Sequence, residues 1–332
     1  MHEQVTRLEV RQVLDAYGRI SRHIRPTPLL YSHYLSEASG ARVWLKPECW
    51  QTTGSFKVRG ALNKVGLLSS EQRVRGIVTG SAGNHGLGVA YAARSAGESD
   101  TRVRADVFVP VTAPRTKVQK LVQLGAEVHE TGRTYEDAHQ AAERFAERSG
   151  ALYISAYDDL DVIAGQGTVG LEIVRELPQA DLILVPVGGG GLIAGVASVA
   201  KAMSSDLRVI GVQPQASPAA LLSLRDGVAY DPYEHEPTIA DGLAGGFGRT
   251  PFRLARQLID DVLLASEAEI RRAIYVLLHQ HQLIVEPSGA IAISPLLNGA
   301  LDVRGLDIVC ILTGGNIETA LLHQVLDEHS AR

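Results

Sequence analysis

Short apolar runs alternate with amphipathic stretches along most of this chain, and that alternation constrains its fold more than any other feature. Helical periodicity occupies residues 114–124 and 134–148, and a strand end followed by a long helix is predicted over 260–282. Strands that alternate with helices predict an α/β fold, in which parallel sheets carry helices on both faces. Seven runs have the length and apolar composition of strands: residues 75–80, 103–109, 126–130, 151–155, 181–187, 207–213 and 306–312.

The chain is long enough for two packed lobes. It has 332 residues, of which 45% are apolar and 21% charged, as in ordinary globular proteins. No repeat, low-complexity tract or linker rich in proline and serine marks a boundary. We therefore expect a discontinuous arrangement, with one lobe inserted into the other. The last chemical motif ends near residue 316, so no appended regulatory domain is expected.

Charge and hydropathy exclude several kinds of partner. The formal net charge is −5 and no basic block is present to neutralise phosphates, so no nucleic-acid partner is expected. The longest apolar runs are strand-length, and residues 1–7 lack the apolar region of a signal peptide, so no membrane association is expected. Cys49 and Cys310 lack metal-ligand spacing. The prediction is a cytoplasmic enzyme or binding protein.

The segment 53–61 places Lys57 where a turn-rich stretch gives way to a predicted helix. An amine in the first turn of a helix feels the positive end of the helix dipole, which favours the neutral, nucleophilic form. A neutral lysine can condense with an aldehyde to form a Schiff base. Most lysines are only surface charges, and three glycine-rich loops further along the chain are what favour the chemical interpretation here.

The first of these loops, residues 81–86, follows a predicted strand and opens a predicted helix. Ligands of open α/β sheets bind at the carboxyl ends of strands, where helix N-termini expose free N–H groups. Ser81, Asn84 and the backbone amides suit a carboxylate and a phenolic oxygen. Alternatively, Ser81 or Asn84 caps the helix. The side chain of His85 is expected to pack or hydrogen-bond structurally.

The second loop contains four successive glycines, 188–191, directly after an apolar strand. Their free N–H groups can surround an anion, and the helix that follows adds its dipole, so a phosphate is the expected guest. A dinucleotide site would require an acidic residue after the next strand, where this chain has Gln213, which disfavours a nicotinamide cofactor. A purely structural turn does not need four glycines.

The third loop, residues 312–316, is again a strand end that leads toward a helix. Thr313 offers a neutral hydroxyl to a ring nitrogen, or it caps the helix. Glu286 precedes a helix that begins with proline. Its carboxylate is either structural or close to a cofactor, and the sequence leaves both choices open.

Taken together, these segments resemble the β-family, or fold type II, of pyridoxal-phosphate enzymes, and within it the serine/threonine dehydratase (threonine ammonia-lyase) and serine racemase group. The resemblance extends from residues 25–28 to residues 315–316, and the four motifs occur in the family's order. It implies a tryptophan-synthase-β-like fold with two lobes, built on open, parallel, twisted sheets with helices on both faces. Residues 1–49 and 151–332 would form a large cofactor-binding domain, and residues 50–150 a small mobile domain.

The resemblance also implies roles for individual residues. Lys57 would bind pyridoxal 5′-phosphate as a Schiff base and serve as the catalytic residue, with Phe56 beside the cofactor ring. Asn84 would hydrogen-bond the phenolic oxygen, and Thr313 would face the pyridine nitrogen and leave it largely unprotonated. Two loops would hold the phosphate and the substrate: Gly188, Gly189, Gly190 and Gly191 the phosphate, and Ser81, Ala82, Gly83, Asn84 and His85 the substrate.

Three positions separate this chain from parts of that family. Cysteine-synthase and threonine-synthase relatives carry an aspartate where this chain has Arg59, so the motif looks like that of the dehydratases. Metal-dependent racemase-type relatives carry a glutamate in place of Gln213, so no metal is expected. The racemases place a serine where this chain has Ala82.

The expected reaction is β-elimination from L-threonine, L-serine or both, which yields a 2-oxo acid and ammonia. Alternatives are a serine racemase, a β-replacement enzyme and a dehydratase of another β-hydroxy amino acid such as hydroxyaspartate or phenylserine. A non-catalytic nucleotide-binding or sensory module built on the same loops is the alternative from another class. The resemblance implies a homodimer or a homotetramer.

Overall fold

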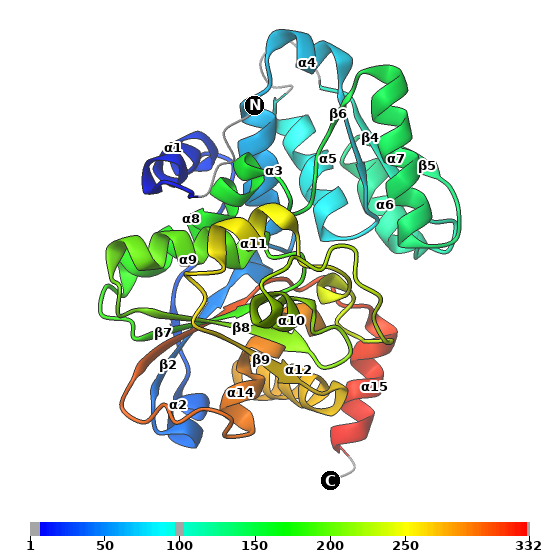
Figure 1. Cartoon of the computed structure of the whole chain (residues 1–332). Coiled ribbons are helices and arrows are strands. Elements are labelled where there is room, and N and C mark those ends of the chain that lie inside the picture. The colour runs from blue at the N-terminus through cyan, green and yellow to red at the C-terminus, as the bar shows by residue number, and fades with distance from the viewer. Residues whose placement is uncertain (1–6, 97–102, 331–332) are drawn as a thin grey trace.

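The computed structural model describes residues 7–96 and 103–330, which form two sheets with helices around them (Figure 1). The larger sheet has six strands in the order β1-β2-β10-β7-β8-β9. Strand β1 is antiparallel to β2, and all other neighbours in this sheet are parallel. Its strands are β1 (Leu30–Tyr31), β2 (Arg42–Pro47), β7 (Leu182–Pro186), β8 (Arg208–Pro214), β9 (Asp261–Ala265) and β10 (Asp307–Leu312).

The smaller sheet is parallel throughout and has four strands in the order β5-β4-β3-β6. It lies in the upper part of Figure 1, and the larger sheet lies below it. Its strands are β3 (Ile77–Gly80), β4 (Ala105–Val109), β5 (Glu127–Glu130) and β6 (Leu152–Tyr153).

Helices connect the strands and cover the sheets, as the α/β prediction requires. Two long ones, α8 and α9, pack against each other beside the larger sheet (Figure 1). The α-helices are α1 (Val10–Ile20), α2 (His33–Ser39), α3 (Lys57–Gly66), α4 (Ser70–Arg75), α5 (Asn84–Ala96), α6 (Arg115–Gln123), α7 (Tyr135–Ser149), α8 (Leu160–Glu176), α9 (Gly191–Met203), α10 (Ala219–Asp226), α11 (Arg249–Ala255), α12 (Glu267–His281), α13 (Pro287–Ala290), α14 (Ser294–Leu297) and α15 (Thr319–Ser330). Short 3-10 turns are η1 (Glu48–Trp50), η2 (Asp241–Leu243) and η3 (Ile291–Ile293).

Side-chain caps fix where several helices begin. Ser266 and Glu269 form a reciprocal capping box at the start of α12, and Thr134 with Asp137 does the same for α7. The carboxylate of Asp159 accepts from two N–H groups at the start of α8. These caps satisfy donors that a helix start otherwise leaves without acceptors.

Both faces of the larger sheet are buried, and this places the core on either side of it. Along β10, Val309 and Ile311 belong to the apolar cluster that includes α8 and α9. Residues 308, 310 and 312 of the same strand belong to the cluster on the opposite face, with α12. Alternate side chains of a strand point to opposite faces, so a strand buried on both sides is apolar throughout, as β10 is over residues 308–312.

The structure confirms the α/β prediction. Each of the seven predicted strands is present, and each begins within two residues of its predicted start. The division into domains at residues 50 and 150 stays a prediction; β6, which joins the small sheet, begins at Leu152. Residues 1–6, on which the expected lack of a signal peptide partly rests, lie outside the described residues. In the described part of the chain, no helix has both the length and the apolar character to span a bilayer.

Candidate active site

Lys57 is the first residue of α3, and its backbone is tied to the end of β10. The N–H of Phe56 donates to the carbonyl of Thr313 at 3.0 Å, and Ser55 forms a β-bridge with Gly314. The amine of Lys57 is partly buried and donates to the carbonyl of Ala156 at 3.0 Å. The lysine therefore lies between the carboxyl ends of both sheets, where ligands of α/β folds bind.

Burial lowers the pKa of the Lys57 amine from 10.5 to about 8, and the nearby carboxylate of Glu286 opposes this shift. From the sequence, the helix dipole is expected to favour the neutral form of the amine. The direction is the same, but the larger cause is removal of the amine from water, which disfavours its charged form. The amine also lies 5.3 Å from the centroid of the Phe56 ring. The lowered pKa gives Lys57 a larger neutral, nucleophilic fraction near neutral pH than an ordinary lysine has.

The side chain of Asn84 is held by residues from two other segments. Its Nδ2 donates to Oε1 of Glu286 at 2.6 Å, and its Oδ1 accepts from Nδ2 of Asn316 at 2.7 Å. Both partners lie outside α5, Asn316 after β10 and Glu286 before α13, so the amide of Asn84 is not used to cap its own helix. An amide nitrogen has two hydrogens, and one of them remains for a ligand.

Glu286 is buried, and the structure shows where its carboxylate points, which the sequence left open. Burial, followed by repulsion from Asp241, raises the pKa of its carboxyl from 4.5 to about 7. The bond from Asn84 and the charge of Lys117 act in the opposite direction. Glu286 is the residue before α13, but its carboxylate makes no cap to that helix. It is directed instead to the Asn84 side of the site.

The other residues of the loop 81–85 differ in what they offer. The hydroxyl of Ser81 accepts from the N–H of Gly83 at 3.3 Å. The ring of His85 is buried, and its Nε2 hydrogen-bonds the carbonyl of Ile154 at 2.9 Å. Burial, with a smaller effect of Lys57, lowers the pKa of His85 to about 3. This imidazole is therefore neutral and packed into the core, as expected for its side chain. Ser81, Ala82 and Gly83 are only partly buried.

The four glycines link β7 to α9, and neighbouring atoms leave no room for a Cβ at three of them; one on Gly188 would lie 2.8 Å from the carbonyl oxygen of Gly242. Gly190 has φ +90, a conformation that favours glycine. A Cβ on Gly190 would lie 2.3 Å from the Phe247 ring, and one on Gly189 would lie 2.3 Å from the Tyr157 ring. The expectation that structure alone does not need these glycines is therefore wrong for Gly188, Gly189 and Gly190. Tyr157 follows Ala156, so one dipeptide contacts both the Lys57 amine and the glycine loop.

Thr313 lies at the end of β10, and its Oγ1 donates to the carbonyl of Ser288 at 3.2 Å. The next helix, α15, begins six residues later at Thr319, so Thr313 does not cap it. The side chain is 4% exposed and neutral. Gln213 is also fully engaged within the protein. Its amide accepts from the N–H groups of Ala220 and Leu221 and donates to the carbonyl of Val187.

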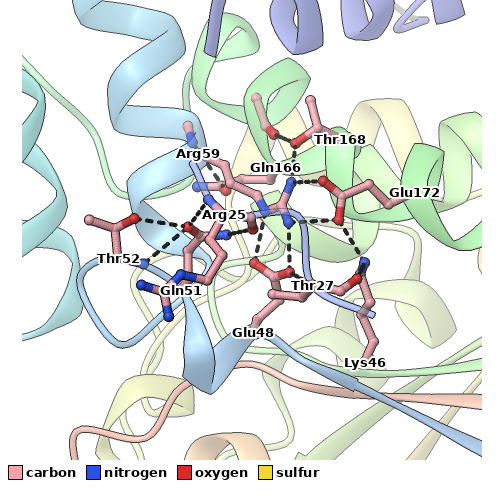
Figure 2. Close-up of polar contacts among 12 residues, drawn as sticks. Arg25, Thr27, Lys46, Glu48, Gln51, Thr52, Arg59, Gln166, Thr168 and Glu172 are labelled. Atoms are coloured by element: carbon pink, nitrogen blue, oxygen red, sulfur yellow. Dashed lines mark hydrogen bonds and ion pairs between the residues drawn. The ribbon is translucent and has the colours of Figure 1, made fainter. Parts of the chain in front are cut away.

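Two groups near Lys57 cannot be predicted from the sequence pattern. Ala156 acts through its backbone carbonyl, which no sequence pattern reveals. The other is a set of buried charges around Arg59, drawn in Figure 2. The side chain of Arg59 is 0% exposed. Lys46, Glu48 and Glu172 surround it. In the sequence, Arg59 is distinctive only as a departure from an aspartate, and nothing local predicts its burial. In the described residues, no group of three or more His, Cys, Asp or Glu side chains is arranged to hold a metal ion.

A partly buried lysine and a glycine loop at the start of a helix, at the carboxyl ends of parallel strands, form the arrangement that an enzyme working through a Schiff base requires. The chain belongs to the family described as pyridoxal-phosphate dependent enzymes, whose model matches residues 20–314. Pyridoxal 5′-phosphate is therefore its cofactor.

Relatives and solved structures agree with this family over nearly the whole chain. It is 40% identical to the L-threonine ammonia-lyase of Thermotoga maritima, over 97% of this chain and 79% of that protein. The processed form of threonine deaminase isoform 2 from Solanum lycopersicum has a TM-score of 0.91 at 33% identity, covering 97% of this chain and 88% of that one. Maize serine racemase has a TM-score of 0.88 at 31% identity, covering 97% and 98%.

The residues present fit this cofactor. The start of α9 and the glycines before it form a cradle without side chains, and the first N–H groups of a helix have no intrahelical acceptor, so they suit a phosphate. The amine of Lys57 suits an aldehyde, and the second N–H of Asn84 suits a phenolic oxygen. The neutral hydroxyl of Thr313 would suit a ring nitrogen that carries no proton once its one hydrogen turns from the carbonyl of Ser288 to that nitrogen.

Proposed function

We propose that the protein is a pyridoxal-phosphate-dependent ammonia-lyase that converts L-threonine, L-serine or both into a 2-oxo acid and ammonia by β-elimination. The observation that carries the proposal is the Lys57 amine, whose pKa is lowered to about 8 where the loops after β3, β7 and β10 meet. The named activities of the relatives, L-threonine ammonia-lyase and threonine deaminase, support the same reaction.

Each residue has a defined task in this proposal. When bound, the cofactor supplies the aldehyde for Lys57 and an electron sink for the bond broken at Cα of the substrate. Lys57 Nζ removes the Cα proton. Residues 81–84, at the start of α5, bind the substrate carboxylate through backbone N–H groups and the Ser81 hydroxyl. Asn84 and Thr313 orient the ring, and Gly188, Gly189, Gly190 and Gly191 hold the phosphate.

Elimination needs one base at Cα and a route for the leaving β-hydroxyl, and Lys57 meets the first requirement. A racemase requires a second group that returns a proton from the opposite face. Ala82 occupies the place in the loop where the racemases carry a serine, and its methyl group can neither donate nor accept a proton. The structural likeness to maize serine racemase keeps racemisation as the second candidate.

The test is release of 2-oxo acid from L-threonine, L-serine, hydroxyaspartate and phenylserine, with chiral analysis of the remaining amino acid. Lys57→Ala is expected to lose turnover and the cofactor that borohydride fixes to the protein. Lys64→Ala is the matched control, because Lys64 is paired with Asp159 at 2.7 Å and Asp161 at 2.9 Å and does not face the site. A Lys57→Ala protein with substantial turnover would overturn the proposal.

The proposed setting is a cytoplasmic homodimer or homotetramer with no nucleic-acid or membrane partner. The oligomer is inferred from the family resemblance alone. Its test is light scattering during size-exclusion chromatography, and a monomer that retains full activity would contradict it.

A further inference from the structure

Four charged side chains are buried together behind Lys57, and the reaction proposed above assigns them no task. We call this group, Lys46, Glu48, Arg59 and Glu172, the buried ion cluster (Figure 2). Arg59 lies at its centre on α3, whereas Glu172 comes from α8 and the other two from β2 and η1. Its formal charges cancel, with two cations and two carboxylates. Burial alone would raise the pKa of Glu48, but its cationic partners outweigh burial and hold this pKa below 4.5. The carboxyl is therefore ionised.

Every N–H group of the Arg59 guanidinium has an acceptor. Nε and Nη2 donate to the two oxygens of Glu48 at 2.8 and 2.7 Å. Nη1 and Nη2 donate to the two oxygens of Glu172 at 2.8 and 2.9 Å. The fifth bond runs from Nη1 to Oγ1 of Thr168 at 3.2 Å. Since a guanidinium has five N–H donors in a rigid plane, this arrangement fixes its orientation, not only its charge.

The backbone of α3 is confined sideways by two glycines. A Cβ on Gly88 of α5 would lie 3.2 Å from the carbonyl of Lys57, and one on Gly165 of α8 would lie 2.7 Å from the carbonyl of Arg59. These close approaches hold the first turn of α3 between two helices. Side-chain contacts of α3 add to this packing: Arg59 makes five hydrogen bonds, whereas Asn63 and Lys64 each contact two partners.

Rotation of α3 decides where the Lys57 amine points. Residues two apart in a helix lie on nearly opposite faces, so Lys57 faces the site while Arg59 faces the buried ion cluster. We propose that Arg59 is the positioning residue of Lys57: its five hydrogen bonds lock the rotation of α3 and thereby aim the amine at the cofactor aldehyde and the substrate Cα. This inference rests on the proposed role of Lys57.

A purely structural role predicts something different. Ion pairs buried in a core are weak evidence for stability, because desolvation offsets much of their attraction. If the cluster only held the fold, any change in it would lower stability and activity in parallel. If Arg59 aims Lys57, a variant that keeps the charge but loses the planar fork affects chemistry beyond its effect on stability, since a displacement of ~1 Å at a reacting group costs about 100-fold in rate.

The experiment compares three variants of the cofactor-loaded protein. Arg59→Lys keeps the charge and loses two donors. Thr168→Val removes one acceptor of Arg59, and Thr27→Val is its matched control, because Thr27 donates to Glu48 at 2.6 Å and makes no contact with Arg59 in this cluster. The measurements are kcat, KM, melting temperature and the pH at which the visible absorption band of the bound cofactor changes.

We expect Arg59→Lys to lower kcat about 100-fold with a smaller change in KM, and to shift the pH midpoint of the band. Thr168→Val should do the same to a smaller extent, and Thr27→Val should lower only the melting temperature. Parallel losses in Thr168→Val and Thr27→Val, or an unchanged kcat and band in Arg59→Lys, would overturn the proposal. If Arg59→Lys does not fold, an unchanged kcat and band in Thr168→Val overturns it.

Failure of this inference is distinct from failure of the proposed function. If Lys57→Ala keeps a cofactor that borohydride fixes to the protein, Lys57 is not the Schiff-base residue and both fail. If Lys57→Ala loses that label while Arg59→Lys behaves as the wild type, only the positioning role of Arg59 fails.

Discussion

The side-chain amide of Asn84 donates a hydrogen bond of 2.6 Å to Oε1 of Glu286, although 202 positions separate the two residues. This bond joins the start of α5 to the residue before α13. It orients the amide while leaving its second N–H for the cofactor. Glu286 thus serves as the anchor of Asn84, and its carboxyl, whose pKa burial raises to about 7, titrates in the range where the enzyme is expected to work.

Replacement of Glu286 by glutamine should change the pH dependence of stability. The carboxyl loses its proton at about 4.5 in the unfolded chain and at about 7 in the native one, so the native state binds more protons between these values. Wild-type stability therefore falls, relative to Glu286→Gln, as pH rises through that window, and the difference is constant above it. Urea unfolding of both proteins at several pH values measures this difference. A difference that is independent of pH would show that Glu286 has an ordinary pKa.

The rate at which the cofactor-free protein condenses with added pyridoxal 5′-phosphate should report the Lys57 amine. Only the neutral amine attacks, so the rate rises with pH and levels off above about 8 instead of near 10.5. The negative charge of Glu286 raises the pKa of Lys57. Glu286→Gln should consequently move the midpoint of the profile to lower pH. Stopped-flow absorbance follows the reaction, and a profile that still climbs steeply above pH ~9 would contradict the lowered pKa.

The elements that sequence predicts well here are those whose cause is local. Strand β10 is apolar over residues 308–312 because both its faces are buried, and this pattern alone is sufficient. Strand β2 was missed because Arg42 and Lys46 interrupt its apolar pattern. Lys46 is 0% exposed only because Glu172, 126 positions away, neutralises it.

The same distinction applies to the site. Lys57 and the glycine loop are readable from sequence because each combines an unusual residue with a strand or helix end. The partners of Asn84 are not, since they are brought to it by the packing of the two sheets. The reason for glycine at residues 189 and 190 is likewise non-local, because the rings of Tyr157 and Phe247 occupy the space.

Replacement of Gly190 by alanine should destabilise the fold as well as the cofactor site. Gly190 has φ +90 and lacks room for a Cβ, whereas Gly227 has φ +72 with nothing within 4 Å. Gly227→Ala is therefore the matched control for backbone strain alone, which costs about 1 kcal/mol. Gly190→Ala should cost about 1–3 kcal/mol more through the contact with Phe247, and it should weaken binding of the phosphate. Chemical unfolding and a cofactor titration measure the two effects. Equal losses of stability in the two variants would show that Phe247 yields without cost.

Ala82 gives the clearest test of elimination against racemisation. Racemisation needs a proton delivered to Cα from the face opposite Lys57, and the methyl group of Ala82 cannot supply one. Ala82 is partly buried against the apolar cluster around Leu87, and serine differs from alanine by a single hydroxyl, so Ala82→Ser should fold normally. We expect the wild type to form 2-oxo acid from L-serine with little D-serine.

Ala82→Ser should gain racemisation at the expense of elimination, because a hydroxyl at this position provides the missing acid. Chiral chromatography of serine after incubation with each protein measures the D-isomer, and a 2-oxo acid assay on the same samples measures elimination. Gly83→Ser, one position further along the same loop, is the control for a hydroxyl in the wrong place. If the wild type forms D-serine as fast as pyruvate, another residue supplies the second proton, and the choice of lyase over racemase is wrong.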